Sequence, residues 1–246
     1  MTRLPDAKVR RARRGRWWHR RAAWLYDGLC AGELTDHREH AGEGPMPVTL
    51  HPLGRMVFPF GQLVLADPYL IGAHPRPMAQ TLRVTPYDVV AADVEISLGH
   101  HRTAAALLVS GDGPVVSWEP AGFAGAKPGL RWDSYLGYGV DSGAGCFVGM
   151  PSAKRIGPVL EADDGRLQDR LSQALFGEEE PVGGVLVEVV AGMPLAAFPS
   201  GWGDGCYPTW LGRDASGEVA VVVTDFLVVT DPYLARRGAR GRGRAA

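Results

Sequence analysis

Two glycine-rich segments carry side chains that could do chemistry. Residues 137–147 read GYGVDSGAGCF and residues 200–208 read SGWGDGCYP, and both contain the pattern Gly-x-Gly-Cys-aromatic. Paired glycines allow positive φ angles and the close approach of another group. If Asp141 and Asp204 converged with Asp225, which ends a later apolar run, the carboxylates would suit a divalent cation or a general acid/base pair. Asp beside Gly is also common turn chemistry. We expect the Asp141 and Asp204 segments to meet and form one site.

The cysteines in these segments have a catalytic and a structural interpretation. Cys146 or Cys206 could be a nucleophile at a turn, with His100 or His101 as the base. Free cysteine is, however, among the most buried residue types. We therefore favour inert core thiols over a Cys–His pair.

The aromatic residues beside the second segment could line a pocket. Trp202, Tyr207 and Trp210 lie near Ser200 and Asp204, a mixture of apolar walls and polar anchors, although aromatic residues also pack within sheets. Because the segments also hold Ser142, the candidate ligand-binding set is Asp141, Ser142, Cys146, Ser200, Trp202, Asp204, Tyr207 and Asp225.

Motifs for common cofactors are missing from the sequence. No Gly-x-Gly-x-x-Gly opens a helix after a strand, and no Gly-Lys-Ser/Thr exists, so dinucleotide and P-loop sites are unsupported. The spacing of His37 and His40 resembles that of zinc ligands, but they lie in a Gly/Pro-bounded loop and do not form the His-Glu-x-x-His helix pattern. We expect neither a metal nor a cofactor.

The elements that must position these residues are mostly strands. Apolar runs separated by Gly, Pro and Asp predict strands at 62–66, 81–85, 89–98, 104–110, 115–119, 185–190 and 218–229. Leu167, Leu171 and Leu175 predict a helix over 166–176. The fold class expected is a β-dominated α+β domain, mostly antiparallel sheet or sandwich, with one or two short helices.

A short motif occurs twice at the end of an apolar run. Residues 63–70 and 227–234 both end in Asp-Pro-Tyr-Leu. Proline cannot donate a hydrogen bond to a sheet and restricts the residue before it. The motif therefore predicts the end of a strand in both places.

The charges divide the chain of 246 residues into three parts. Residues 1–26 carry nine basic side chains against one acid, residues 236–246 carry five arginines and no acid, and residues 27–235 carry 12 basic and 26 acidic side chains. Trp17, Arg21 and Trp24 lie on the stripe of a possible N-terminal helix, whereas residues 31–55 are rich in glycine and proline, which predicts a loop or linker. We expect a dispensable basic arm and linker over 1–45, a single β-rich domain over 46–235 and an Arg/Gly-rich tail over 236–246.

The charge pattern and the cysteines limit the partners and the compartment. The acidic body repels nucleic acid and anionic membranes, so these could bind only through the basic termini. No apolar run approaches the roughly 20 residues of a membrane span. Three cysteines without a C-x-x-C pair suit a reducing compartment. We expect a cytoplasmic protein that binds an unidentified small molecule or protein.

Three segments in order carry a family resemblance. Residues 137–147, 200–208 and 217–226, together with the strand region 89–119, resemble the signature segments of a bacterial family catalogued as domain of unknown function 4241. The resemblance covers roughly residues 56–230 and implies no particular activity.

Two classes of function stay open. The first is a non-catalytic domain that recognises a ligand or a protein through the Gly/Asp/Trp loops. The second is a hydrolase or small-molecule transferase that uses Asp141, Asp204 and Cys146. We favour binding, because no nucleophile–base pair stands out.

Overall fold

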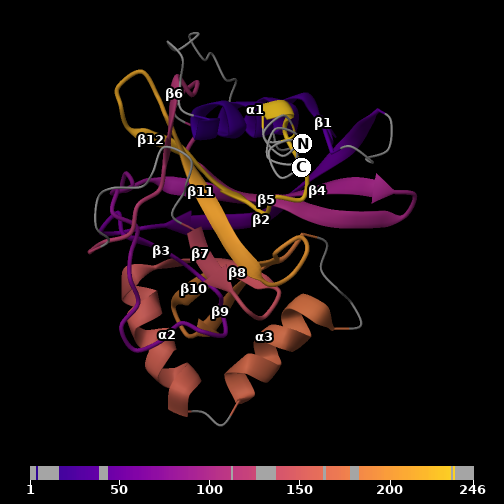
Figure 1. Ribbon diagram of the computed structural model, residues 1–246. Helices are drawn as coiled ribbons and strands as arrows, with labels where there is room; N and C mark the ends of the chain where they lie inside the picture. The colour runs from indigo at the N-terminus through magenta and orange to yellow at the C-terminus, as the bar shows by residue number, and fades with distance from the viewer. Residues whose placement is uncertain are drawn as a thin grey trace, which may run out of the picture.

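The computed structural model describes residues 4, 17–38, 44–111, 113–125, 137–162, 165–177, 183–233 and 235, which form two antiparallel sheets and three helices (Figure 1). The large sheet contains, in spatial order, β1 (Glu33–Thr35), β2 (Pro45–Val57), β4 (Pro86–Ser97), β5 (His100–Val109), β12 (Val219–Asp225), β11 (Gly205–Arg213) and β6 (Ser117–Pro120), and β7 (Gly137–Val140) also pairs with β11. The small sheet contains β3 (Leu63–Ala66), β8 (Ala144–Gly149), β10 (Met193–Pro199) and β9 (Val185–Val190).

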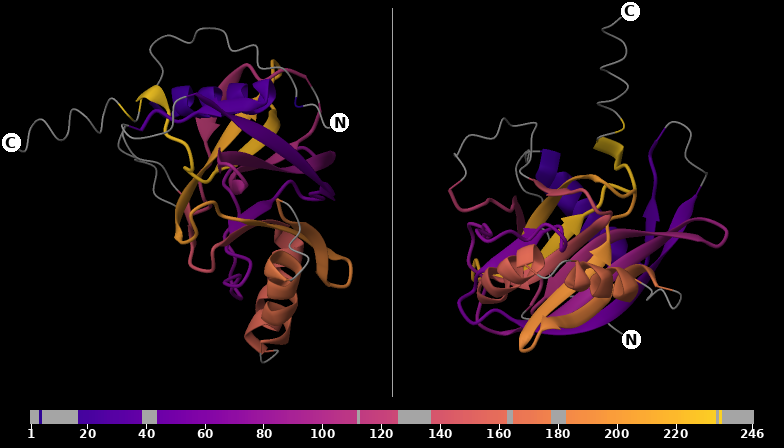
Figure 2. Two further views of the ribbon diagram at one scale, coloured as in Figure 1. Left: turned by 90° about the vertical axis from the view of Figure 1, so that its right-hand side faces the viewer. Right: turned by 90° about the horizontal axis from the view of Figure 1, so that it is seen from below.

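The elements stack in four layers (Figures 1 and 2). The helices are α1 (Trp17–Ala31), α2 (Met150–Ala162) and α3 (Arg166–Phe176). Helix α1 covers one face of the large sheet, the small sheet packs on the other, and α2 and α3 cover the outer face of the small sheet. The predicted class, β-dominated α+β, is confirmed, although the described part has three helices where one or two were expected.

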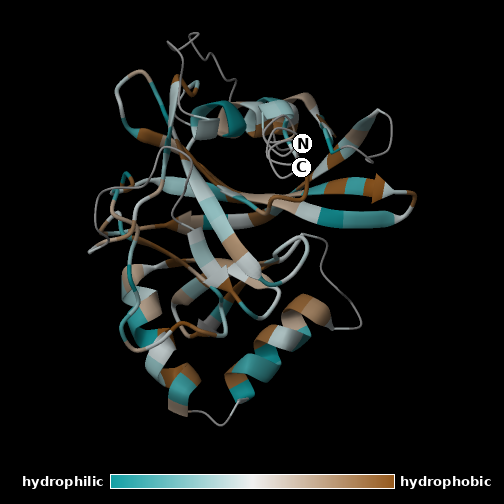
Figure 3. Ribbon diagram, viewed as in Figure 1, coloured by the Kyte–Doolittle hydropathy of each residue, from teal (hydrophilic) through white to brown (hydrophobic). Residues whose placement is uncertain are grey.

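Alternating side chains of the small sheet supply both of its interfaces. Cys146 and Val148 pack with α2 and α3, whereas the intervening Phe147 packs toward the large sheet. There its ring centroid lies 4.8 Å from that of Phe198, edge to face. This period of two is the strand period, and it makes one short strand contribute to two cores. Figure 3 shows the matching pattern on α2 and α3, where hydrophobic and hydrophilic bands alternate.

Several predicted elements are confirmed with their bounds. Helix α3 occupies residues 166–176 and buries its three leucines, and strand β9 occupies 185–190. All seven residues of β12 are buried, because α1 and the small sheet cover opposite faces of the large sheet. The prediction of a strand at 81–85 is wrong, since these residues are in no strand.

Helix α2 has no counterpart among the predicted elements. Pro151 lies in its first turn, where the missing amide proton costs little, but Pro158 and Gly157 lie inside it. A Cβ on Gly157 would lie 2.3 Å from the Gly72 carbonyl oxygen, so only glycine lets the helix backbone contact this loop. Gly157, a residue type that often marks a turn in a sequence, thus serves a close packing contact inside a helix.

The prediction of a loop over residues 31–55 is wrong. Strand β1 pairs with β2, and β2 runs beside β4 with a register shift between Pro52 and Gly54. Proline is tolerated there because β2 has only the three-residue β1 on its other side and a bulge at the irregular position.

A buried arginine attaches α1 to the end of the last strand. The Arg21 and Asp225 side chains have no solvent exposure, and Arg21 Nε and Nη2 each donate to one Asp225 oxygen at 2.7 Å. Arg21 Nη1 donates to the Val229 carbonyl oxygen at 2.7 Å and lies 3.5 Å from Asp231 Oδ2. Burial lowers the pKa of Arg21, but the charges and hydrogen bonds of Asp225 and then Asp231 outweigh it, so the pKa is raised. The guanidinium therefore stays charged inside the core.

This contact changes the expected domain boundary. Residues 1–45 were expected to form a dispensable arm, yet Leu25, Tyr26 and Leu29 are buried in the main core, and the Trp17 ring meets the Trp210 ring edge to face at 6.1 Å. The apolar stripe of α1 has its partner in the large sheet, which is why this helix packs as part of the body. The tail 236–246 lies outside the described residues.

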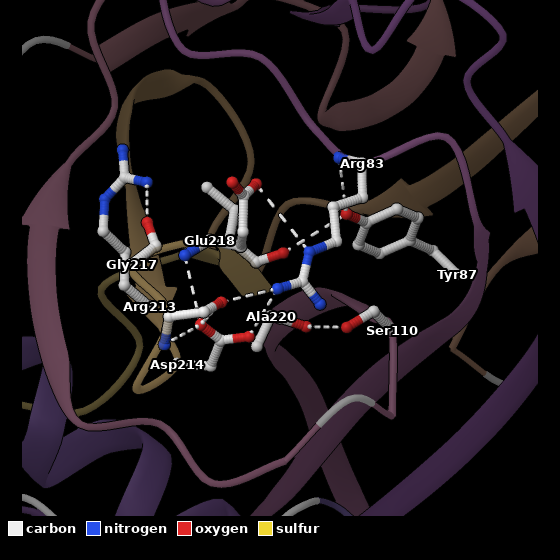
Figure 4. A network of polar contacts seen from close by, with 10 residues as sticks. Arg83, Tyr87, Ser110, Arg213, Asp214, Gly217, Glu218 and Ala220 are labelled. Carbon is white, nitrogen blue, oxygen red and sulfur yellow. Dashed lines mark hydrogen bonds and ion pairs between the residues drawn. The ribbon is translucent and has the colours of Figure 1, made fainter.

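A second polar network closes the turn between β11 and β12 (Figure 4). Asp214 Oδ1 accepts hydrogen bonds from the Ser216 amide, the Ser216 hydroxyl and the Glu218 amide, and Oδ2 accepts one from Arg83 at 2.8 Å. The Tyr87 hydroxyl donates to the Val219 carbonyl oxygen beside it. The network ties the loop before β4 to the hairpin that β12 needs.

We expect Arg21→Met to lower the free energy of unfolding by about 3–5 kcal/mol, because it leaves buried carboxylates without their cation. The control is Arg20→Met, whose exposed guanidinium lies 5.1 Å from the Tyr233 ring centroid and should cost no more than about 1 kcal/mol. Urea unfolding measures both.

A chain of residues 46–246 should also melt far below the full chain, because it lacks α1. An unchanged melting temperature would show that α1 contributes no stability to the body.

The stability supplied by Asp214 should depend on pH. Its pKa is lowered, first by the hydrogen bond from Ser216, and further by the charge of Arg83. Because the unfolded pKa is about 4, the ionised side chain contributes stability at neutral pH that is lost as the pH falls through the lowered folded pKa. Asp214→Asn should destabilise at neutral pH, and this difference should shrink as the pH falls below the unfolded pKa of about 4. A stability difference that stays constant over this range contradicts the assignment.

Candidate functional site

The two glycine-rich segments meet in space, as predicted. The Ser200 amide donates to the Gly143 carbonyl oxygen at 2.9 Å, and a Cβ on Gly143 would lie 3.9 Å from the Gly203 Cα. The adjoining strands are paired as well, since Val140 of β7 is opposite Gly205 of β11. The turns that carry Asp141 and Asp204 therefore lie side by side.

Asp67, which sequence reasoning did not select, fixes the first turn. Its side chain is buried, and Oδ2 accepts hydrogen bonds from the amides of Asp141 at 2.9 Å and Ser142 at 2.8 Å. Oδ1 accepts from the Ser142 hydroxyl at 2.8 Å and from the Tyr69 amide at 2.9 Å. One carboxylate thus replaces water for four donors and joins the end of β3 to the 141–143 turn.

The repeated Asp-Pro-Tyr-Leu motif was the signal that could have identified Asp67. Each Asp of the motif accepts a hydrogen bond from the Tyr amide two residues later, Asp67 from Tyr69 and Asp231 from Tyr233. Each carboxylate also contacts a distant segment. Asp67 accepts hydrogen bonds from the 141–143 turn, and Asp231 lies beside Arg21. The strand-end prediction is confirmed for β3, whereas β12 already ends at Asp225.

Two buried hydroxyls fix the second turn. Ser200 Oγ donates to the Gly203 carbonyl oxygen at 2.8 Å, and the Tyr207 hydroxyl donates to the same oxygen at 2.6 Å. Desolvation raises the pKa of Tyr207, so its hydroxyl stays protonated as a donor. Gly201 and Gly203 adopt φ angles of 65° and 100°, which side chains rarely accept. Ser200 and Tyr207 thus position the turn rather than face solvent.

Four side chains on these two turns are exposed: Asp141, Ser142, Trp202 and Asp204. We call them the paired-turn surface. Trp202 is 49% exposed, which is high for so large an apolar side chain, and the Arg102 guanidinium from β5 lies 5.3 Å from its ring centroid. The surface therefore combines two carboxylates with an aromatic face that already accepts a cation.

The cysteines of the two segments lie in different environments. Cys146 is fully buried between the small sheet and α2, and burial raises the pKa of its thiol well above the usual range. A protonated, inaccessible thiol does not attack a substrate, so the inert interpretation fits Cys146. The expectation of a core thiol is wrong for Cys206, which is exposed on β11. His100 and His101 are exposed near the turn between β4 and β5.

Asp225 does not join the other two carboxylates, so the three do not form a common cation or acid/base site. It is held by Arg21 and by Trp210 Nε1, which donates at 3.2 Å, on the face of β12 beneath α1. Asp141 and Asp204 instead lie on exposed turns. A strand directs neighbouring side chains to opposite faces, so the sequence position of Asp225 near a strand end did not decide where its carboxylate points.

The described residues lack a cluster of potential metal ligands. They contain no group of three or more His, Cys, Asp and Glu side chains that could hold a metal ion. His37 packs edge to face on Trp24, and His40 lies outside the described part. None of the described helices is long and apolar enough to span a membrane.

We expect Asp67→Ala to reduce the free energy of unfolding by about 2–4 kcal/mol, because it leaves several donors of the first turn without their acceptor. Asp204→Asn is the matched control on the exposed side and should change stability by no more than about 0.5 kcal/mol. Urea unfolding compares them. Similar losses for both variants would mean that Asp204 is a structural residue.

Comparison with known proteins identifies a family. The model described as "Protein of unknown function (DUF4241)" matches residues 56–224, which include both turns and Asp67. The matched range contains neither Arg21 nor Asp225. No curated protein and no solved structure matches the chain. Because the match covers well over half of the sequence, the chain belongs to the DUF4241 family of proteins of unknown function.

Proposed function

We propose that the protein is a non-catalytic recognition domain that binds its partner at the paired-turn surface. One observation carries the proposal: two turns from distant parts of the chain are fixed by buried hydrogen bonds, yet present exposed polar and aromatic side chains. A frame that is ordered before binding reduces the conformational entropy lost on association. Such an arrangement suits recognition.

The chemistry of the surface favours a cationic group with an apolar stem. The Trp202 ring attracts cations, as its contact with Arg102 illustrates, and Asp141 and Asp204 add negative charge to the same surface. Residues 27–235 carry 14 more acidic than basic side chains, which attracts cations from a distance. An Arg or Lys side chain of a partner protein, or a small-molecule amine, has the required charge and stem.

The alternative, a hydrolase or small-molecule transferase using Asp141, Asp204 and Cys146, has less support. The Cys146 thiol is buried, and the Ser142 hydroxyl donates to Asp67. Among the described residues no histidine is hydrogen-bonded to that hydroxyl. A site without an activated nucleophile favours binding over catalysis.

We also propose that the protein acts in the bacterial cytoplasm. Cys30 and Cys206 are exposed cysteines, which suits a compartment that keeps thiols reduced. The basic terminal segments 1–16 and 236–246 fall almost wholly outside the described residues, and contact with nucleic acid or an anionic membrane would depend on them.

Binding of an acetylated tetra-arginine amide, measured by isothermal titration calorimetry, tests the recognition proposal. We expect the double variant Asp141→Asn/Asp204→Asn, and separately Trp202→Ala, to weaken binding by about tenfold, since each removes charge or cation–π attraction. Asp88→Asn, a change at an exposed carboxylate on β4, is the control and should bind as the wild type does.

A tetra-glutamate peptide should not bind. The proposal is contradicted if tetra-arginine does not bind the wild type, or if the Asp88 control weakens binding as much as the double variant.

A further inference from the structure

A cavity of about 410 Å³ lies between the loop after β3 and strand β7. This volume is in the range of small-molecule sites. Its apolar lining comes from Val64, Leu65, Leu70, Ile71, Phe123 and Tyr138. Leu70 is 59% exposed although it lines the cavity, so an apolar side chain stands at the opening. The cavity offers an apolar ligand a surface that is otherwise in contact with water.

Two basic side chains line the same cavity. His74 and Arg76 are exposed, and no acidic residue is among the described residues that line it. Neither side chain is joined by a hydrogen bond or an ion pair to another residue of the described part. By contrast, Arg55 pairs with the Asp88 carboxylate. The Arg76 guanidinium at this opening therefore carries a positive charge that an anionic ligand can neutralise.

The cavity walls are fixed before any ligand binds. Isolated bridges pair Val64 with Pro77 and Met78 with Phe123, and the Met78 amide donates to the Leu63 carbonyl oxygen at 2.7 Å. These backbone contacts hold the chain on both sides of the cavity to β3.

Helix α2 supports the remaining loop. The Ala73 amide donates to Glu161 Oε1 at 3.1 Å, and Gly157 permits backbone contact with Gly72. The cavity is thus preformed, which reduces the ordering cost of binding.

We infer that this cavity binds small amphipathic anions, which carry one anionic group on a short apolar chain or ring. The apolar part fills the space between Leu65, Ile71 and Phe123, and the anionic group lies beside Arg76 and His74. The inference goes beyond the recognition proposal, because no residue of the paired-turn surface lines the cavity and the preferred charge is opposite.

Octanoate, octanol and octylamine are matched probes, because they share the chain and differ in the charge of the head group. Calorimetry should give the order octanoate, octanol, octylamine from tightest to weakest. Arg76→Gln should weaken octanoate binding by up to about fivefold and change octanol binding little, because an exposed charge contact contributes modestly. Leu70→Asp should also weaken octanoate by placing a negative charge at the opening.

Arg55→Gln is the control, a change at an exposed arginine of β2. Both test positions are exposed, so unchanged melting temperatures establish that the variants are folded. Equal affinity for the three head groups, no octanoate binding at millimolar concentration, or equal effects of Arg76→Gln and Arg55→Gln would overturn the inference.

Two further measurements separate the ligand source and the two proposals. Phosphatidylglycerol vesicles that bind in an Arg76-dependent way, in addition to octanoate, would place the anionic group on a lipid, whereas octanoate binding alone indicates a free acid. The variant Asp141→Asn/Asp204→Asn should bind octanoate normally. Loss of octanoate binding in that variant would contradict a separate cavity site, whatever its response to tetra-arginine.

Discussion

Burial of one ion pair constrains the whole architecture. Removing a guanidinium from water costs free energy. Arg21 is tolerated in the core because Asp225, Asp231 and the Val229 carbonyl oxygen surround it. These partners lie at and beyond the end of β12, so the chain after the last strand must turn back under α1. The Trp24 ring, 5.0 Å from the guanidinium carbon, closes the site. With α1 held there, both faces of the large sheet are covered, which explains why every residue of β12 is buried.

Strand β11 connects this ion pair to the paired-turn surface. Trp210 donates its indole proton to Asp225 on the α1 side, whereas Tyr207 holds the Gly203 carbonyl oxygen beside the exposed turns. The side chains of one strand thus serve the core and the surface, because they alternate between faces. The family match covers β11 but neither Arg21 nor Asp225, so within this chain the surface belongs to the shared part and the ion pair lies outside it.

Asp67 lies between the two proposed binding regions. Its carboxylate holds the 141–143 turn, and its neighbours Ala66 and Leu70 line the cavity. Strand β7 likewise begins at the cavity with Gly137 and leads to Asp141. The two regions differ in charge: two carboxylates share the paired-turn surface with the exposed Trp202, whereas basic side chains line the apolar cavity. A single rigid frame therefore presents two surfaces suited to ligands of opposite sign.

The sequence by itself determined the fold class, helix α3 and the adjacency of the two glycine turns, because these follow from local periodicity and from a repeated motif. Tertiary structure decided the rest. Helix α2 was not predicted, and Gly157 within it is explained by its close contact with Gly72, whereas the prolines of β2 depended on which strands flank it. Asp225 resembled a site residue until Arg21, 204 positions away, neutralised it, and Asp67 acted on a turn 74 positions away. Spacing in a sequence specifies periodic burial, but the partner of a buried charge is set by the folding of distant segments against one another.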